Sequence, residues 1–406
     1  MTDPIGVAVI GAGMAGRAHA AAYRTATTLY DPVLPPVRLV SVGDLNPDLG
    51  QAAARSYGYE RTDADWRTIA DDPAIDVVSV VVANSLHREI VEGLLAAGKH
   101  VLCEKPLSDT LDDARAMADA ARAASGIARV GFTFRRSPGI AFIRDLIQDG
   151  ILGPVRHVSG RYWTDYAATP DIPISWRHKG GPGSGALADV GSHLSYLAEF
   201  FAGDVVEVSG GRFATVIGER PKALGTVTRT GAVAVSDEVD TVENDDYAAF
   251  SAAFAGGASG GLEVSRVAKG HANTLVLEVF AENGSATFDF RRPAEIGLHL
   301  ASDSPGQSGF RQVFLGPDHP YLSRGLPMDA TGVGFGQNDG FVFQARAFLE
   351  EVAGITGDGA LPPCATFDEG VHNMELLAAV AQSAARNGAA VAVPAATGAT
   401  ERLVSA

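Results

Sequence analysis

The strand, glycine-rich turn and helix that open the chain constrain its fold more than any other feature. An apolar run at 5–10 is followed by Gly-x-Gly-x-x-Gly and then by an alanine-rich segment. Glycines in this context allow a tight turn and let a pyrophosphate approach the N-terminus of the helix. The sequence therefore predicts a dinucleotide-binding turn, with cofactor contacts from Gly11, Gly13, Met14, Ala15 and Gly16.

The second predicted strand ends in an acidic residue, Asp44. In dinucleotide-binding folds an acid at this place accepts hydrogen bonds from the adenosine ribose hydroxyls. The spacing from Gly16 exceeds the ~20 residues typical of the fingerprint, and the prolines within 27–37 indicate a loop that accounts for the excess. Leu45 and Asn46 follow, with no arginine to meet a 2′-phosphate. We therefore expect NAD, with NADP less favoured.

Strands and helices continue to alternate through the first third of the chain. Apolar strands are predicted at 76–83, 101–104 and 128–134, and helices at 47–58, 87–100 and 111–125. This pattern is typical of a doubly wound parallel sheet, an α/β Rossmann domain, with helices on both faces. Ligands of such sheets bind beyond the carboxyl ends of the strands. Polar residues follow two of those ends, and we expect cofactor contacts from Asn84, His87, Glu104 and Lys105. The alternative for His87 is a residue that only begins a helix.

The pattern changes from residue 132 onward. A helix at 142–153 precedes successive strands at 154–163, 205–217, 245–268, 274–290 and 297–302, separated by turn residues. Asn283-Gly284 is a hairpin signal. These features predict an α+β domain with a large open, mostly antiparallel sheet. We expect domains at 1–131 and 132–406, an irregular stretch at 301–340, and a C-terminal helix at 368–387 that packs back on the first domain.

An apolar segment at 186–203 carries Asp189 and His193 four residues apart. Apolar residues recur there at spacings of three and four, which predicts a helix with one stripe against a core. The aspartate and histidine then share another face. A functional pair and two solvated polar residues both remain open at this point.

The composition limits the kinds of molecule that the protein is expected to bind. A net charge of −16 argues against nucleic acid and anionic membranes, which require clustered Lys and Arg. The two cysteines, Cys103 and Cys364, lack the spacing of a zinc site, and we expect no metal. No apolar run approaches the ~18 residues of a membrane span, and no secretory signal opens the sequence, so we expect a cytoplasmic protein. The open sheet predicts a homodimer or homotetramer.

Several motifs, in this order, resemble the Gfo/Idh/MocA oxidoreductases. They are GAGMAGRAH, ANSLH, CEKPLS, GFTFRR and GGPGSGALADVGSHLSYLAEFFAG. The resemblance implies a Rossmann domain followed by an α+β domain, and oxidation of a secondary hydroxyl of a sugar or cyclitol with NAD(P). It points to the inositol or anhydrosugar side of the family, with levoglucosan oxidised at C3 as the specific expectation. By the same resemblance, Lys105 is the catalytic lysine, Asp189 orients the substrate and His193 is the general base.

Elementary chemistry suits these roles. Removing the hydroxyl proton requires a base, and histidine titrates near neutrality. A lysine ammonium beside the substrate oxygen stabilises developing alkoxide charge. Pro106 fixes the backbone next to Lys105, where the resemblance implies a cis peptide. The alternative for Lys105 is a surface lysine that precedes a helix.

Aromatic and basic residues crowd the segment before the catalytic helix, which suits a pocket for the C–H face and the hydroxyls of a sugar ring. The alternative is core packing at a sheet edge. Arg135 lies where the chain leaves the first domain, which borders the substrate site in the resembled family; solvation is its alternative. The expected substrate contacts are Lys105, Arg135, Trp163, Trp176, Arg177, Asp189 and His193.

Other functions remain open. One is an NADP-linked keto-sugar reductase or a diol dehydrogenase, which Asp44 argues against. Another is a cofactor-binding sensor without turnover, because a fold alone does not establish catalysis. The presence of Lys105 together with His193 argues against a sensor.

Replacement of Asp44 by serine tests the cofactor expectation. The Asp44→Ser variant loses the carboxylate that repels a 2′-phosphate, so its affinity for NADPH relative to NADH should rise. Relief of ~1.4 kcal/mol of repulsion corresponds to a factor of about ten. Fluorescence titration with both cofactors measures this ratio without a substrate, and Asp44→Glu, which keeps the charge, should retain the wild-type ratio. An unchanged ratio in Asp44→Ser would mean that another feature sets the preference.

Overall fold

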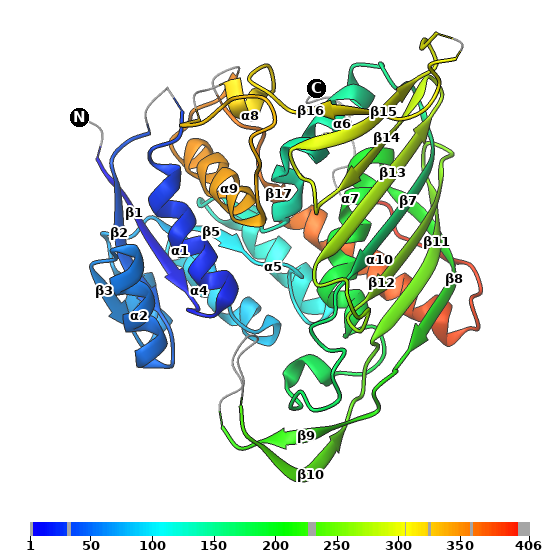
Figure 1. The fold of residues 1–406 in the computed structure, drawn as a ribbon. Coiled ribbons are helices and arrows are strands. Elements are labelled where there is room, and N and C mark those ends of the chain that lie inside the picture. Colours follow the sequence, from blue (N-terminus) through cyan, green and yellow to red (C-terminus); the bar gives the residue numbers. More distant parts are fainter. Residues whose placement is uncertain are drawn as a thin grey trace. The chain divides into compact units, whose positions relative to one another are not determined.

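A computed structural model describes residues 3–30, 34–225, 233–304, 306–323, 326–357 and 360–396. The chain divides into two compact units (Figure 1). The first unit comprises Met1–Pro138 and Gly316–Val371, and the second comprises Gly139–Leu315 and His372–Ala406. This grouping differs from the single expected division after residue 131, because a later segment of the chain returns to the first unit.

The first unit is built on a seven-stranded sheet in the order β17-β6-β5-β4-β1-β2-β3. All neighbouring strands are parallel except the edge strand β17, which pairs antiparallel with β6. The strands are β1 (Ile5–Ile10), β2 (Val37–Gly43), β3 (Arg61–Asp63), β4 (Val77–Val80), β5 (His100–Cys103), β6 (Ala128–Val130) and β17 (Ala365–Thr366). This sheet confirms the predicted Rossmann domain.

The helices of the first unit are α1 (Met14–Ala26), α2 (Pro47–Tyr57), α3 (Trp66–Asp71), α4 (His87–Ala96), α5 (Leu111–Ala123), α8 (Pro320–Ser323) and α9 (Gln337–Val352). Four of them lie where they were predicted, α1, α2, α4 and α5, whereas α3, α8 and α9 were not predicted. Helix α1 packs against α9, and α4 packs against α5. Local signals explain the boundaries of α2: the Asn46 side chain accepts from the Asp48 N–H, and Gly58 ends the helix at φ 75°.

Buried polar contacts hold the returning segment in the first unit. Arg346 of α9 is fully buried, pairs with Glu350 at 2.7 Å and donates to the Leu29 carbonyl. The Tyr30 hydroxyl donates to the Tyr321 carbonyl at 2.9 Å. A sequence pattern does not reveal such contacts, because their partners are about three hundred residues apart. The stretch 301–340, expected to be irregular, contains β16 (Arg311–Phe314), α8 and the start of α9.

The second unit is built on a nine-stranded sheet in the order β16-β15-β14-β13-β7-β12-β11-β8-β18. Only β7 and β12 pair in parallel, so the predicted mostly antiparallel sheet is confirmed. Its strands other than β16 are β7 (Val155–Trp163), β8 (Val205–Ala214), β11 (Tyr247–Phe254), β12 (Ser259–Ser265), β13 (Thr274–Ala281), β14 (Gly284–Asp289), β15 (Glu295–Leu300) and β18 (Val391–Ala392). A separate two-stranded sheet contains β9 (Glu219–Ala223) and β10 (Val235–Thr241).

The helices associated with this sheet are α6 (Pro138–Gln148), α7 (Ser192–Ala202) and α10 (Phe367–Ala385). Helix α7 packs on β7 and β12, and Leu194 of α7 lies so close to Gly160 that a Cβ there would be 2.9 Å from its Cδ1. Helix α10 begins in the first unit, where Asp368 pairs with Arg122, and continues from His372 in the second. The expected return of the C-terminal helix to the first unit thus applies to its first turn.

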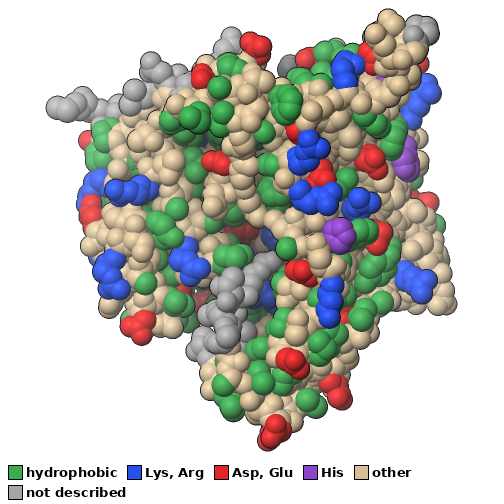
Figure 2. All heavy atoms as spheres, viewed as in Figure 1, with side chains coloured by type: hydrophobic (Ala, Val, Ile, Leu, Met, Phe, Trp, Pro, Cys, Tyr) green, Lys and Arg blue, Asp and Glu red, His purple; other side chains and the backbone are tan. Residues whose placement is uncertain are grey.

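The described residues contain no helix with the length and apolarity needed to cross a membrane. On the face drawn in Figure 2, basic and acidic side chains of these residues are interspersed. A polyanion requires a continuous basic surface, which this face does not offer.

The hairpin predicted at Asn283-Gly284 forms between β13 and β14, but the glycine has another role than the expected turn. Neither residue has a positive φ. Instead, Gly284 begins β14 beside β15, where a Cβ would be 2.4 Å from the His299 carbonyl oxygen. Close approach of two strands therefore requires glycine here.

Alanine at position 284 should lower the free energy of unfolding by about 1–3 kcal/mol, because the Cβ forces β14 and β15 apart. Gly256, in the turn between β11 and β12, is the matched control, since a Cβ there meets only the Ala202 oxygen at 4.0 Å. Gly256→Ala should change stability by less than about 0.5 kcal/mol. Urea unfolding of both variants measures the difference; equal effects would contradict the steric account.

Candidate active site

The glycine-rich turn has the geometry that a dinucleotide needs. Gly11 has φ +103°, and a Cβ there would be 2.0 Å from the Val81 oxygen. A Cβ at Gly16 would be 1.8 Å from the Gly11 oxygen, so α1 can start close to the turn only without a side chain at that position. Gly13 has no atom within 4 Å of its Cβ position and caps α1 without a side-chain hydrogen bond. The first N–H groups of α1 therefore fit a pyrophosphate.

Asp44 follows β2 and holds this turn. Its Oδ2 accepts from the Ala12 N–H at 2.7 Å, and its Oδ1 accepts from the Asn46 N–H at 2.8 Å. The sequence predicted a contact with the adenosine ribose. The structure adds that the same carboxylate ties the end of β2 to the glycine turn, which keeps a negative charge beside it.

Asn84 and His87 follow β4, but the structure separates their roles. Asn84 is half-exposed and opens the 3₁₀ turn Asn84–Leu86. His87 begins α4 and is fully buried, with Nδ1 3.1 Å from the Leu107 oxygen and Nε2 3.3 Å from the Val82 oxygen. Burial lowers its pKa. A neutral imidazole has one N–H, so His87 donates to one of these two carbonyls, which holds its ring within the first unit. The expected contact of His87 with the cofactor stays a prediction.

Glu104, Lys105 and Pro106 follow β5. The Lys105–Pro106 peptide is cis, as predicted, and Lys105 is half-exposed. Glu104 is buried: its Oε2 accepts from the Lys105 N–H at 3.2 Å, and its Oε1 lies 2.9 Å from Nε2 of His19. The carboxylate expected at the cofactor is thus turned into the first unit. Sequence reasoning missed His19, although it stands in the quoted glycine motif.

Asp189 and His193 belong to one helical segment with two geometries. Leu187–Gly191 forms a π-helical turn, and α7 continues from Ser192, where a single α-helix was predicted. Both side chains are half-exposed. The Tyr166 hydroxyl donates to Asp189 Oδ2 at 2.9 Å, and the His193 ring lies 6.2 Å from the Tyr162 ring. Such π turns are frequent at functional sites.

Alternation along β7 separates Tyr162 from Trp163. Tyr162 is buried on the face of β7 that packs on α7, and its ring lies beside the ring of His193. Trp163 lies on the opposite face, 4.8 Å from the Arg161 guanidinium and 4.9 Å from the His271 ring. The structure thus places Trp163 on the face of β7 opposite His193, because a one-residue step along a strand moves a side chain to the other face. Its expected substrate contact stays a prediction.

Two other expected substrate contacts form one surface feature. Trp176 is 54% exposed, and the Arg177 guanidinium stacks on its ring at 4.3 Å. Both belong to the short 3₁₀ turn Trp176–His178 of the second unit. Arg135 belongs to the first unit, half-buried in the turn Thr133–Arg136, with Nη1 3.7 Å from Glu369 Oε1.

His178 ends the same 3₁₀ turn and is buried. Unlike an exposed histidine, it does not take up a proton near neutrality. Burial, together with the positive charges of Arg220 and Arg266, lowers the pKa of His178 to about 3. Its Nδ1 faces the N–H of Ser175 at 3.1 Å. The imidazole therefore stays neutral and serves as an acceptor within the fold.

A buried carboxylate organises the start of the helical segment. Asp245 is 1% exposed, and its Oδ1 accepts from the Gly183 and Gly185 N–H groups at 2.8 and 3.0 Å. Its Oδ2 accepts from the Leu187 N–H at 2.8 Å. Sequence reasoning gave Asp245 no role. The available signal was the acidic run Glu-Asn-Asp-Asp at 243–246 immediately before a strand.

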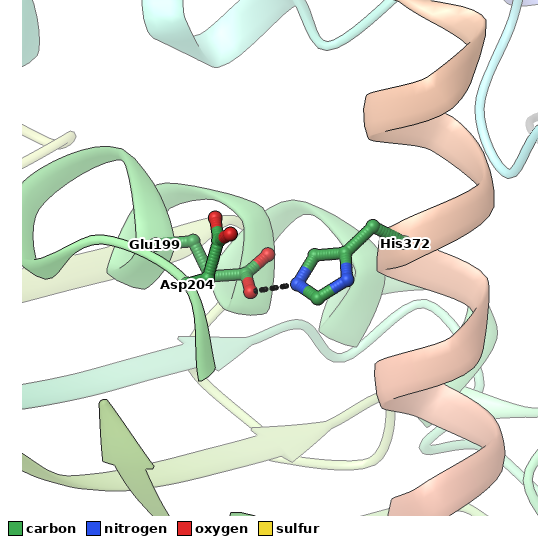
Figure 3. A group of neighbouring side chains, drawn as sticks. All are labelled: Glu199, Asp204 and His372. Atoms are coloured by element: carbon green, nitrogen blue, oxygen red, sulfur yellow. Dashed lines mark hydrogen bonds and ion pairs between the residues drawn. The ribbon is translucent and has the colours of Figure 1, made fainter. Parts of the chain in front are cut away.

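One group of side chains has the composition of a metal site, although the sequence predicted none. Glu199, Asp204 and His372 place potential ligand atoms within 4.8 Å of one another (Figure 3). Glu199 Oε1 already accepts from His372 Nε2 at 2.7 Å and from the Val205 N–H at 2.9 Å. The group therefore acts as a buried tie between α7, β8 and α10.

Loss of the Asp245 carboxylate should destabilise the second unit. Asp245→Ala leaves three backbone N–H groups without their acceptor, at about 1–3 kcal/mol each. Glu243 is the control, because its exposed carboxylate also accepts from a glycine N–H, that of Gly180, at 3.1 Å. Glu243→Ala should cost less than about 1 kcal/mol. Thermal and urea unfolding compare the two; similar losses would show that burial of Asp245 does not matter.

Comparison with known proteins agrees with this geometry. The model of the oxidoreductase family with an NAD-binding Rossmann fold matches residues 5–132, and that of the GFO/IDH/MocA C-terminal domain matches residues 140–287. The levoglucosan dehydrogenase of Pseudarthrobacter phenanthrenivorans is 36% identical over 394 residues, covering 94% of this chain and 96% of that protein. The myo-inositol 2-dehydrogenase of Thermotoga maritima is 26% identical over 309 residues, covering 76% and 81%.

A solved structure is also similar over nearly the whole chain. Levoglucosan dehydrogenase in complex with NADH and levoglucosan has a TM-score of 0.85 and 33% identity, covering 97% of this chain and 100% of that chain. The sequence similarity and the structural similarity thus both extend across the two units. The chain belongs to the Gfo/Idh/MocA family of oxidoreductases, and its first unit contains the family's NAD-binding Rossmann fold.

Proposed function

We propose that the protein is an NAD-dependent dehydrogenase that oxidises a secondary hydroxyl of an anhydrosugar, with levoglucosan oxidised at C3 as the first candidate. Related sugars and cyclitols such as inositols are the wider substrate class. The observation that carries the proposal is the presence of three half-exposed polar side chains of the required types. Lys105 stands in the Glu-Lys-Pro segment with its cis peptide, Asp189 lies in the π-helical turn and His193 lies in α7. Similarity to levoglucosan dehydrogenase over 94% of the chain supports the substrate class.

The proposed roles follow from the chemistry of the reaction. Oxidation removes a proton from the hydroxyl oxygen and a hydride from the carbon. His193 accepts the proton, because imidazole titrates near neutrality. The Lys105 ammonium stabilises the developing alkoxide, and Asp189, fixed by Tyr166, orients the sugar. Bound NAD supplies the hydride acceptor.

The proposed cofactor contacts come from the first unit. The turn Gly11, Gly13, Met14, Ala15 and Gly16 binds the pyrophosphate, Asp44 binds the adenosine ribose, and Asn84 and Lys105 bind the nicotinamide end. The fixed negative charge of Asp44 supports NAD over NADP. For the substrate we propose contacts from Arg135, Trp176 and Arg177, of which Trp176 is the most exposed.

We also propose that the protein assembles as a homodimer or homotetramer. The face of the nine-stranded sheet opposite α7 is hollowed and lined by residues that include Arg161, Glu263 and Glu278. Oppositely charged groups on one face can pair across a twofold axis, because the same patch then meets itself.

The first experiment measures NADH formation from NAD with levoglucosan, other pyranoses and a set of inositols at alkaline pH. Lys105→Ala and His193→Ala should lower kcat by about 10²- to 10⁴-fold and still bind NADH, because they remove groups used in proton transfer and charge stabilisation. The pH limb that reports the base should disappear in His193→Ala.

Matched controls are Lys179→Ala and His157→Ala, whose side chains bind Glu243 and Ser259 elsewhere in the second unit. Both should keep wild-type turnover. Binding of NAD without oxidation of any compound in the panel, or unchanged turnover in Lys105→Ala and His193→Ala, would contradict the proposed function.

A further inference from the structure

A chain of buried polar contacts runs through the first unit to the Glu-Lys-Pro segment. The Tyr23 hydroxyl lies 2.8 Å from Ser79 Oγ, which lies 3.1 Å from His19 Nδ1. His19 Nε2 lies 2.9 Å from Glu104 Oε1, and Glu104 Oε2 accepts from the Lys105 N–H at 3.2 Å. These hydrogen bonds therefore connect α1 and β4 with Lys105, to which the proposed function assigns a catalytic role.

An ionised Glu104, the usual state of a glutamate near neutrality, gives an assignment of protons that satisfies every link. Its Oε2 accepts from the Lys105 N–H, and its Oε1 accepts from His19 Nε2. A neutral imidazole with its proton on Nε2 accepts at Nδ1, so Ser79 donates to it and Tyr23 donates to Ser79. Burial raises the pKa of Tyr23, which keeps that donor protonated. No charge other than the carboxylate is required.

The histidine ring is fixed from every side. His19 is 2% exposed, and its ring meets the ring of Phe341 of α9 edge-on at 5.2 Å. Glu104 is 9% exposed, and its two carboxylate oxygens bind His19 Nε2 and the Lys105 N–H. These two hydrogen bonds hold the carboxylate against the peptide that joins Glu104 to Lys105.

We propose that His19 is a positioning residue that acts through Glu104 to set the backbone, and hence the side-chain direction, of Lys105. The inference rests on the proposed function for its role in catalysis but not for its geometry. Because His19 belongs to the helix that opens at the glycine-rich turn, the same contact links the pyrophosphate end of the cofactor site to the catalytic lysine. Loss of the His19 N–H frees the carboxylate to rotate, and Lys105 then loses its fixed position.

Methyl NMR of the lysines tests this geometry without a substrate. The chain has only five lysines, Lys99, Lys105, Lys179, Lys222 and Lys269, so reductive ¹³C-methylation gives few signals, and Lys105→Arg identifies the one of interest. In the presence of NAD, His19→Leu should move the Lys105 signal and its titration midpoint. The other four signals should stay in place.

Two variants separate positioning from packing. His19→Gln keeps an N–H donor for Glu104 and should return the Lys105 signal towards the wild-type position. His100→Gln is the matched control: His100 begins β5 at its other end, and its Nδ1 accepts from the Ile127 N–H at 3.0 Å without contact to Glu104. It should leave the Lys105 signal unchanged. An unchanged Lys105 signal in His19→Leu would overturn the inference.

If His19→Leu does not fold, Glu104→Gln gives the same readout, because it keeps the shape of the side chain and removes the carboxylate. Movement of the Lys105 signal supports the inference, and an unchanged signal overturns it. Where wild type oxidises a substrate, kcat of His19→Leu should fall by about 10- to 100-fold, as is typical for partners of functional groups, with partial recovery in His19→Gln. Absence of wild-type turnover would reject the proposed function and leave the NMR comparison intact.

Discussion

Buried carboxylates that accept backbone N–H groups hold the segments of both units that carry the proposed site residues. Asp245 binds three N–H groups at the start of the segment that carries Asp189 and His193. A buried charge is costly unless hydrogen bonds compensate it, so each such carboxylate permits few alternative conformations of the backbone around it. The loops it binds are thereby fixed without contributing side chains of their own.

The first unit has two carboxylates that bind backbone N–H groups, the half-buried Asp44 and the buried Glu104. Asp44 binds the Ala12 N–H and thus joins the second strand to the glycine-rich turn. Glu104 binds the Lys105 N–H while His19 holds its other oxygen. In each case an acid for which the sequence predicts a contact with the cofactor binds the backbone of its own unit. A substitution at either position therefore alters the backbone geometry, which is why conservative variants are the informative ones.

Much of the fold was predictable because its signals are local. Apolar runs of strand length and the spacing of Gly11, Gly13 and Gly16 indicate the Rossmann domain, and turn residues between 205 and 302 indicate the antiparallel sheet. The directions of individual side chains were not predictable in the same way. Trp163 and Tyr162 are neighbours in sequence but face opposite sides of β7, and His87, the last residue of the predicted segment at 83–87, is fully buried. Proximity in sequence does not give the direction of a side chain.

The sequence by itself determined the two architectures, the family resemblance and the identity of Lys105, Asp189 and His193 as the residues to examine, because motif spacing and apolar periodicity record local geometry. Only the tertiary structure decided how those residues are held. His19 meets Glu104 from 85 residues away, and Asp245 meets Leu187 from 58 residues away. Such hydrogen bonds depend on which elements the completed sheets bring together, and no local pattern encodes that pairing.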